Sequence, residues 1–409
     1  MRAMPKAARP RAPSSRASAR PGAPASRRAR AAIAVRSEVA QKLLHWFDAG
    51  KRDLPWRKTA DAYAIWVSEI MLQQTRVEVV KRYYQTWMER FPNVQSLAQA
   101  KTDDVLRVWQ GLGYYSRARR LQEGAVYIVR EHQGIVPRSH EQLLRVPGVG
   151  PYSAGAIGSI AFGQRVPAID GNVVRVVCRY DALTGDPNRA PIKGLIEGRV
   201  QEWLPEERVG DFNQALMELG ATVCLPRAPL CAACPVRPGC QGFAQGIAAS
   251  LPTPKERSQP TSVRALPLLF RSRGRLLVLR LPEGARWWAG LSVLPTLEVG
   301  SASAGALTPL SLGLELKGDS GDLGASLLKT LAQVATNELN VRPIGPLTHT
   351  VTRHRVELNP FEIRAPRGGL EGLGERAQAG AALVWLRPSD ALKEPLAAPF
   401  RKILERSSE

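Results

Sequence analysis

Four cysteines lie close together in the sequence and could hold a metal centre. They follow the pattern Cys224-x6-Cys231-x2-Cys234-x5-Cys240, within 17 residues. Thiolates at such short spacing can close on one centre, either an iron–sulfur cluster or a zinc ion. The first gap of six residues is long for a zinc knuckle, whose ligands usually come in close pairs, so the spacing favours the cluster. The fifth cysteine, Cys178, lies apart and is expected to be a small buried residue.

Glu69 is a carboxylate with apolar neighbours on a predicted helix. Ile65, Trp66 and Leu72 stand at positions i−4, i−3 and i+3 from it. Burying a charged Glu among such side chains is costly, and burial raises the pKa of its carboxyl group. A Glu of this kind suits a general acid near neutral pH. The alternative is an ordinary Glu on the solvated face of the helix.

A second carboxylate, Asp170, follows a glycine-rich turn. Gly148 and Gly150, in Val-Pro-Gly-Val-Gly, separate two expected helices. The amide N–H groups of such a hairpin, with the N-terminus of the following helix, can hold a phosphate, although a plain interhelical turn is the alternative. Asp170 comes twenty residues after Gly150. It could simply cap the helix that begins at Gly171, and it could also stabilise positive charge on a deoxyribose.

Two short segments could contact bases. Glutamine amides can hydrogen-bond to bases, and aromatic or apolar wedges can fill the hole that a flipped base leaves in the stack. For Tyr114 and its neighbour Tyr115, core packing is the alternative. The residues that could do this are Gln73, Gln74, Thr75, Leu112 and Tyr114.

The charge of the chain indicates a polyanionic partner. The chain has 409 residues, a formal net charge of +21 and a pI near 10.4. Residues 1–36 contain nine arginines, one lysine and no acidic residue, so +11 remains on the rest. Nucleic acid is the commonest partner of such a basic protein. No run of 18 or more apolar residues occurs, so no membrane-spanning segment is expected.

Residues 1–36 are expected to form a disordered basic arm that adds non-specific attraction to phosphates. Their Arg-, Ala-, Pro- and Ser-rich composition also resembles an organelle transit peptide, which is the alternative. They lack the apolar stretch of a secretory signal. Because clustered cysteines are typical of a reducing compartment, we expect a bacterial-type intracellular protein of the cytoplasm or nucleoid.

Helical periodicity dominates up to residue 245. A helix is expected from Ser37 to about Asp48, and Ile65, Trp66, Ile70 and Met71 recur at helical spacing. Further helices are expected near 76–90, 95–100, 102–110, 115–132, 139–145, 151–162, 171–183, 191–203 and 211–221. The sequence therefore predicts an all-α domain over residues 37–245.

The composition changes after this domain. Residues 246–262, rich in Pro, Ser and Thr, are expected to be a linker. An α+β domain is expected over residues 263–409, since short β-like runs return there. Its expected elements are strands at Arg264–Phe270, Arg275–Leu281 and Leu347–Ile363, a loop at 299–325 and a helix at Gly324–Leu339.

Taken in this order, the motifs resemble those of the MutY-type adenine DNA glycosylases, within the endonuclease III-like helix–hairpin–helix superfamily. The matching stretches are Leu54–Trp56, Ser68–Thr75, Gly111–Arg119, Pro147–Gly150, Asp170–Val173 and the four cysteines. The resemblance is dense over residues 37–245 and looser beyond them. It implies a monomer with a [4Fe-4S] cluster in the loop 224–240, acting on double-stranded DNA.

The resemblance also implies a role for each site residue. Glu69 would protonate a flipped adenine, and Asp170 would stabilise the oxocarbenium-like sugar, while Tyr152 and Asn172 would position these groups and the water. Related bifunctional enzymes carry at the position of Tyr152 a Lys that forms a Schiff base, so we expect a glycosylase without lyase chemistry. Residues expected to contact DNA are Arg57 and Gln214 in the adenine pocket, and Gln74, Leu112 and Tyr114 around 8-oxoguanine.

Residues 263–409 resemble the Nudix-like domain that reads the 8-oxoguanine strand in this family. Residues 285–325 lack the Arg- and Glu-dense helix of a working Nudix hydrolase, so that activity is not expected. Family members commonly carry Phe-Ser-His in the recognition loop, where this chain has Val351-Thr352-Arg353. Thr352 keeps a hydroxyl, and Arg353 is a hypothetical contact to phosphate or to the modified base.

The expected reaction is hydrolysis of the N-glycosidic bond of adenine opposite 8-oxoguanine, or more weakly opposite guanine. A bifunctional lyase acting on oxidised pyrimidines is one alternative, and Tyr152 argues against it. A DNA-binding protein without catalysis is another, and the presence of both Glu69 and Asp170 argues against it.

Overall fold

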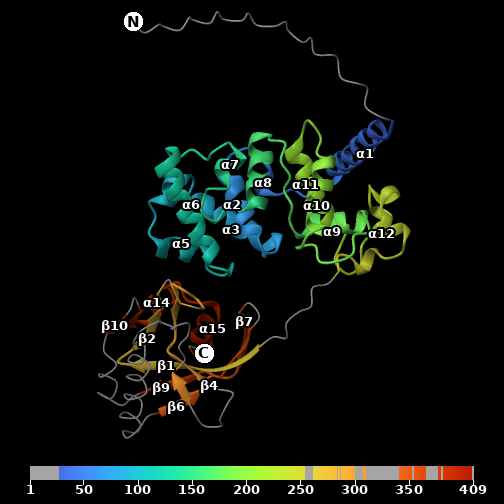
Figure 1. Ribbon diagram of the computed structural model, residues 1–409. Coiled ribbons are helices and arrows are strands. Elements are labelled where there is room, and N and C mark those ends of the chain that lie inside the picture. Colours follow the sequence, from blue (N-terminus) through green and yellow to red (C-terminus); the bar gives the residue numbers. More distant parts are fainter. Residues whose placement is uncertain are drawn as a thin grey trace, which may run out of the picture.

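The chain has a helical part followed by a part built on a β-sheet, and Figure 1 shows one above the other. The computed structural model describes residues 27–253, 261–282, 284–285, 287–299, 307–309, 340–351, 354–364, 376–378 and 381–407. None of the described helices has both the length and the apolar character needed to cross a membrane.

The helical part begins with α1 (Arg27–Gly50), which starts ten residues before Ser37. The early start is explained by the Arg- and Ala-rich segment 27–34, since both residue types favour helix. The expected helices between residues 76 and 222 are confirmed, each to within three residues at either end. The remaining elements are η1 (Pro55–Arg57), α2 (Ala62–Leu72), α3 (Val77–Arg90), α4 (Val94–Ala98), α5 (Thr102–Trp109), α6 (Ser116–His132), α7 (His140–Leu143), α8 (Pro151–Phe162), α9 (Gly171–Tyr180), α10 (Ile192–Trp203), α11 (Val209–Thr222), η2 (Cys231–Ala233), η3 (Arg237–Gly239), α12 (Gln241–Ala244) and η4 (Ala248–Ser250).

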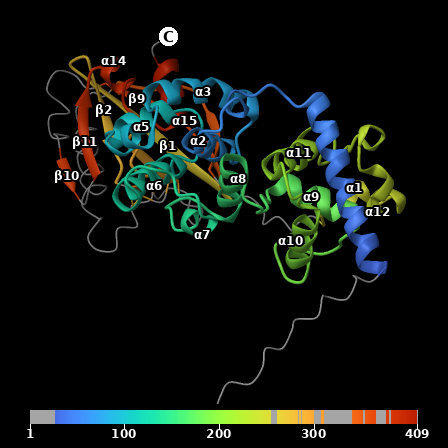
Figure 2. The same ribbon diagram turned by 90° about the horizontal axis from the view of Figure 1, so that it is seen from above.

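The helices pack into two cores. Helices α2 to α8 bury an aromatic cluster that includes Trp66, Trp87 and Trp109. Helices α1, α9, α10 and α11 form the second core around Phe47 and Phe212. Figure 2 shows α1 and α9–α12 to one side of α2–α8. Residues that project from helices of both cores can therefore meet between them.

Strand β1 (Thr261–Ser272) is the centre of the sheet. It runs antiparallel to β2 and β4 and parallel to β8 and β9. The expected strand Leu347–Ile363 is divided into three shorter strands, and β5 falls inside the expected loop 299–325. The expected helix Gly324–Leu339 lies outside the described residues. The other elements are β2 (Arg275–Arg280), β3 (Ser292–Val293), β4 (Thr296–Val299), β5 (Leu307–Pro309), β6 (Asn340–Pro343), β7 (Leu347–Val351), β8 (His354–Leu358), β9 (Phe361–Arg364), β10 (Arg376–Gln378), β11 (Ala381–Leu386), α14 (Pro388–Ala391) and α15 (Ala398–Arg406).

The sheet part contacts the helical part near the end of α5. Gln110 donates a hydrogen bond to the carbonyl oxygen of Leu396 at 3.0 Å, and its own side-chain oxygen accepts one from Arg401 at 3.0 Å. Arg107 donates to the carbonyl of Lys393 at 3.1 Å. These contacts place α15 and the segment before it beside the loop that follows α5.

Candidate active site

A cleft that is partly open to solvent lies between the two helical cores. Helices α2 and α8 contribute to it from the first core, and α9 and α11 from the second. It brings together most of the residues predicted from the sequence to act on substrate. These are Arg57, Glu69, Gln73, Gln74, Thr75, Tyr152, Asp170, Asn172 and Gln214.

Glu69 is buried in the wall of this cleft. It lies on α2, a helix that is apolar on nearly every side, and only 5% of its surface is exposed. The hydroxyl of Tyr152 on α8 donates a hydrogen bond to its carboxylate. Burial raises the pKa of Glu69 to about 7, which the Tyr152 hydrogen bond opposes and the charge of Asp170 reinforces. Glu69 can therefore donate a proton near neutral pH.

Asp170 is both a helix cap and a member of the site. Its Oδ1 accepts hydrogen bonds from the backbone N–H groups of Asn172 at 2.9 Å and Val173 at 2.8 Å. Its Oδ2 accepts from the Asn172 side-chain amide at 2.7 Å. Burial raises the pKa of Asp170 above its ordinary value, and these hydrogen bonds oppose the rise. The cap thus fixes the direction in which the carboxylate faces the cleft.

Asn172 connects Asp170 to the cysteine loop through Arg175. Arg175 donates a hydrogen bond to Asn172 Oδ1 at 2.8 Å and to the carbonyl oxygen of Gly220 at 2.7 Å. Its Nε donates to the carbonyl oxygen of Cys224 at 2.7 Å. The guanidinium group of Arg175 therefore holds Asn172 and the start of the cysteine loop in fixed positions relative to each other.

A second buried carboxylate, Glu218, lies in the cleft wall on α11. Arg52 forms a bidentate ion pair with it at 2.7 and 2.6 Å, and Arg57 donates to it at 2.9 Å. Burial alone would raise the pKa of Glu218, but hydrogen bonds from both arginines outweigh it and lower the pKa to about 2. Glu218 is therefore a fixed anion that orients Arg57, a residue expected to line the base pocket.

The predicted hairpin lies outside the cleft. Gly148 has φ +79°, and a Cβ atom there would stand 2.8 Å from the Cβ of Arg120, so this turn requires glycine. Gly150 is the N-cap residue of α8, with Pro151 in the first turn. This arrangement matches the expected helix–hairpin–helix geometry, in which the turn and the start of α8 face a phosphate.

The loop between α5 and α6 contains the other expected base contacts. Leu112 is buried, whereas Tyr114 is 49% exposed and so is not a core residue. Tyr115 is partly buried and packs against the first core. Thr352 and Arg353 lie outside the described residues; their neighbours Val351 and His354 are paired at the end of the antiparallel strands β7 and β8.

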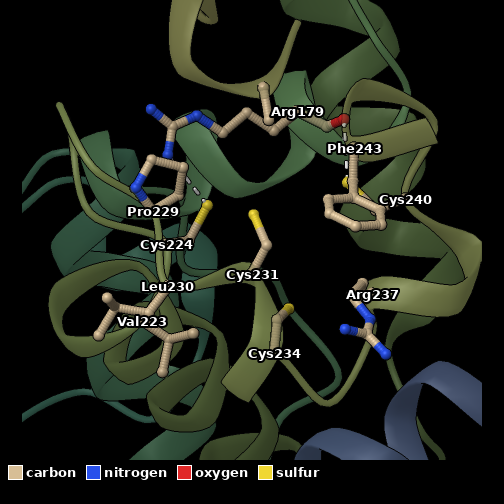
Figure 3. A pocket seen from close by; sticks show the side chains of 11 residues that line it. Arg179, Val223, Cys224, Pro229, Leu230, Cys231, Cys234, Arg237, Cys240 and Phe243 are labelled. Atoms are coloured by element: carbon tan, nitrogen blue, oxygen red, sulfur yellow. Dashed lines mark hydrogen bonds between the residues drawn. The ribbon is translucent and has the colours of Figure 1, made fainter. Parts of the chain in front are cut away.

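The four clustered cysteines line one cavity, part of which is open to solvent. Figure 3 shows Cys224, Cys231, Cys234 and Cys240 around the same space. Arg179 donates a hydrogen bond to the Cys224 sulfur at 3.3 Å. Within the described part of the chain, no three His, Cys, Asp or Glu side chains are grouped closely enough to be a site for a metal ion.

The cavity suits a group with several metal atoms. Its remaining wall is largely apolar, with Val223, Leu230 and Phe243 among the lining residues. Burial raises the pKa of the Cys234 thiol to about 11 and that of the Cys240 thiol above its ordinary value, so binding of a metal group would displace protons from these thiols. Four thiolates around such a space match the ligand set of an iron–sulfur cluster.

Comparison with known proteins identifies the family. A sequence profile for the HhH-GPD superfamily base excision DNA repair proteins matches residues 67–202. Adenine DNA glycosylase of Schizosaccharomyces pombe is 33% identical over 322 residues, which cover 64% of this chain and 70% of that protein. The chain belongs to the adenine DNA glycosylase family.

Other relatives are more similar in sequence over a smaller share of the chain. Human adenine DNA glycosylase is 52% identical over 208 residues, covering 49% of this chain and 38% of the human protein. The chain thus spans less than half the length of the mammalian relatives it matches. A solved thermostable thymine-DNA glycosylase is 28% identical, with a TM-score of 0.48, over 52% of this chain and 99% of that one.

In this member of the adenine DNA glycosylase family, the site also includes residues that the sequence analysis did not identify. Arg52 and Glu218 complete the ion network with Arg57, and Arg175 connects Asn172 to the cysteine loop. Among these residues, only Arg175 could have been predicted from the sequence, because residues three apart on one helix, such as Asn172 and Arg175, can contact each other. The contact between Arg52 and Glu218 joins residues 166 positions apart, and no local pattern predicts it.

Proposed function

We propose that the protein is a monofunctional adenine DNA glycosylase, which hydrolyses the N-glycosidic bond of adenine paired with 8-oxoguanine and, more weakly, with guanine. The observation that carries this proposal is a pair of carboxylates in one cleft, of which Glu69 is buried and Asp170 is half-buried. Glu69 has a pKa of about 7, and Asp170 is oriented by three hydrogen bonds. A proton donor and an anion are what departure of a base from a sugar requires.

Each residue then has a defined task. The flipped adenine enters the cleft, and Glu69 gives its proton to a ring nitrogen so that the base leaves as a neutral molecule. The C–N bond breaks with its electron pair going to the base, and Asp170 stabilises the oxocarbenium-like sugar. Water adds to the sugar carbon and gives its proton to the carboxylate of Glu69, which returns to its acid form. Tyr152 and Asn172 hold the two carboxylates in place.

The absence of lyase chemistry follows from Tyr152. Bifunctional relatives carry a Lys there, whose amine attacks the sugar and forms a Schiff base. The Tyr152 hydroxyl is already committed to Glu69, and burial raises its pKa well above the ordinary value. It therefore remains a neutral hydrogen-bond donor, and water is the nucleophile.

The remaining predicted residues are assigned to DNA. Arg57 and Gln214 line the pocket for the flipped adenine, and Gly148 and Gly150 face a phosphate. The tips of two loops, with residues Gln73, Gln74, Thr75, Leu112 and Tyr114, approach the opposite base.

The four cysteines Cys224, Cys231, Cys234 and Cys240 would hold a [4Fe-4S] cluster. When bound, this group supplies a rigid cross-link of the loop 224–240. The loop would then present its basic side chains, among them Arg237, to backbone phosphates. Iron and sulfide analysis of the purified protein tests this assignment, and one zinc per chain without iron would overturn it.

The C-terminal region, residues 263–409, is proposed to be Nudix-like and to read the 8-oxoguanine strand with the loop that contains Thr352 and Arg353. The linker was predicted at 246–262, but η4 lies within this range and β1 already begins at Thr261, so we place the boundary between these two elements. The basic arm was predicted at 1–36, but α1 begins at Arg27, so we assign to the arm only the residues before α1. We further propose a monomer that acts in the cytoplasm or nucleoid. Replacing Arg353 with Ala should lower the preference for 8-oxoguanine over guanine, and an unchanged preference would remove Arg353 from this role.

The test of the function is single-turnover cleavage of two defined duplexes, with and without borohydride. One contains adenine opposite 8-oxoguanine, and the other an oxidised pyrimidine. Release of adenine, with a strand break only after alkali and little trapped adduct, is expected. Cutting of the oxidised pyrimidine with strong trapping would show a bifunctional lyase. Binding of both duplexes without base release would show a DNA-binding protein.

A further inference from the structure

Arg117, near the start of α6, is buried at the meeting point of two loops. Only 9% of this arginine is exposed. Its Nη1 donates to carbonyl oxygens at and just after the end of α2, and its Nη2 donates to a hydroxyl further along that segment and to carbonyl oxygens of the loop before α6. The acceptors are the carbonyls of Ile70 (2.9 Å), Met71 (2.9 Å) and Gln73, the hydroxyl of Thr75 (3.0 Å), and the carbonyls of Leu112 (3.2 Å) and Gly113 (3.1 Å).

Both loops have a strained residue at their tips. Gln74 has φ +57° and Tyr114 has φ +49°, a left-handed conformation that is unfavourable for residues other than glycine. Both side chains are exposed. Such conformations persist where the surrounding structure over-determines them. The acceptors of Arg117 stand on both sides of Gln74 and immediately before Tyr114, so this side chain supplies that constraint in both loops.

The charge of Arg117 is buried among carbonyl groups and aromatic rings. Among the described residues no carboxylate lies within ion-pair distance of it. Burial lowers the pKa of Arg117 to about 10, so it is still charged at neutral pH. The ring of Trp109 lies 5.2 Å from its guanidinium carbon and that of Tyr114 5.6 Å. Carbonyl dipoles and aromatic rings therefore stabilise the positive charge of Arg117. Donating to so many acceptors at once requires the planar, forked guanidinium group of an arginine.

We propose that Arg117 is a positioning residue that locks the tips Gln74 and Tyr114 into one rigid wedge. The wedge enters the duplex as a unit and occupies the space that the target adenine leaves. This inference rests on the proposed function, since it assigns the wedge to base flipping. Arg117 itself touches neither the substrate nor the reacting atoms.

The wedge matters most where the target base is well stacked and paired. Comparison of the rates on two duplexes distinguishes this role from a general loss of structure. One has adenine opposite 8-oxoguanine, and the other has adenine opposite an abasic analogue, where the target has no pairing partner to leave. In single-turnover assays, Arg117→Met should slow adenine release from the paired duplex on the order of 10- to 100-fold. On the abasic duplex the loss should be no more than about threefold.

Two further variants control this assay. Arg117→Lys keeps the charge, but all its hydrogen bonds come from one nitrogen, which cannot reach both loops. Its rates should therefore resemble those of Arg117→Met rather than those of the wild type. Arg130→Met, at the other end of α6, changes an exposed arginine and should leave both rates unchanged. Circular dichroism and melting temperature establish that each variant is folded.

A second readout does not depend on catalysis. 2-Aminopurine placed next to the target adenine fluoresces when the stack opens, and it is measured in chains that carry Glu69→Gln. Addition of Arg117→Met should abolish most of the fluorescence rise on the paired duplex. An equal loss of rate on both duplexes, an unchanged fluorescence rise, or full activity of Arg117→Lys would each overturn the proposal. If the wild-type chain releases no adenine, the proposed function fails, and the fluorescence experiment decides the wedge role by itself.

Discussion

Glu69 on α2 and Glu218 on α11 line different walls of one cleft, and both are buried, yet their surroundings shift their pKa values in opposite directions. Glu69 is 5% exposed, and Glu218 is 2% exposed. Glu69 receives one hydrogen bond from a neutral hydroxyl, whereas Glu218 receives charged hydrogen bonds from Arg52 and Arg57. Burial raises the pKa of Glu69 to about 7, and the two arginines lower that of Glu218 to about 2.

The difference shows that the partners of a buried carboxylate, more than the burial itself, decide what it can do. Arg57 lies in the same cleft as Glu69 but directs its guanidinium to Glu218. Its effect on the pKa of Glu69 is the smallest of the contributions there. One wall of the cleft therefore keeps a transferable proton, and the other keeps a fixed anion that orients the pocket.

The first prediction removes the acidic proton of Glu69. Glu69→Gln keeps the size and the hydrogen bond to Tyr152 but cannot act as an acid. We expect single-turnover adenine release to fall by about 10³-fold or more, with the affinity for the duplex nearly unchanged. Glu78→Gln, at an exposed carboxylate on α3, is the matched control. Retention of more than about a tenth of the rate would assign the acid to another group.

The second prediction removes the charge of Asp170 and keeps its cap. Asn is as good an N-cap residue as Asp, so Asp170→Asn should leave the melting temperature nearly unchanged. We expect adenine release to fall on the order of 10²-fold, because the sugar cation loses its counter-charge. Asp170→Ala should lose the same rate and also about 1 kcal/mol of stability. If Asp170→Asn keeps the wild-type rate, Asp170 is only a cap.

The sequence predicted the helical part well because its signals are local. Helix ends at residues such as Asp61 and Asp170 coincide with capping side chains, and apolar spacing marks the buried faces. The same holds for Glu69, whose apolar helical neighbours predicted burial. The start of α1 at Arg27 was predicted too late, since the charge pattern of the segment was given more weight than its helix propensity.

The parts that the sequence did not predict depend on contacts between distant segments. The division of 347–363 into three strands reflects pairing with β1, more than 80 residues earlier. Glu218 gave no local sign of its pairing with Arg52 and Arg57, because helix periodicity shows that a residue is buried but not which group it meets. Arg117 was noted only as part of a motif, since a buried arginine that serves backbone carbonyls leaves no partner in the sequence.

The third prediction removes the charge from the other wall of the cleft. Glu218→Gln leaves Arg52 and Arg57 without their anion, and loss of one partner of a buried pair costs about 3 kcal/mol of unfolding free energy. Because Arg57 is no longer held, adenine release should fall about tenfold. Urea unfolding and single-turnover rates check the two effects, with Glu197→Gln at an exposed ion pair on α10 as control. A loss as large as that of Glu69→Gln would mean that the two walls share one catalytic role.

The fourth prediction follows the two carboxylates through pH. Because Glu69 acts in its protonated form with a pKa of about 7, adenine release should fall as pH rises through 7, by about tenfold at pH 8 relative to pH 6. Glu218 has a pKa in the folded protein below its ordinary 4.5, so its contribution to the stability of the fold is present above pH 4.5 and is lost as pH falls toward 2.

Single-turnover rates from pH 5.5 to 9 measure the effect of Glu69, and melting temperatures below pH 5 measure the effect of Glu218. The acid-side loss of melting temperature should shrink in Glu218→Gln while the alkaline fall in rate stays. A rate that is constant from pH 6 to 8.5 would mean that the proton does not come from Glu69. The difference between Glu69 and Glu218 would then affect only the stability of the fold.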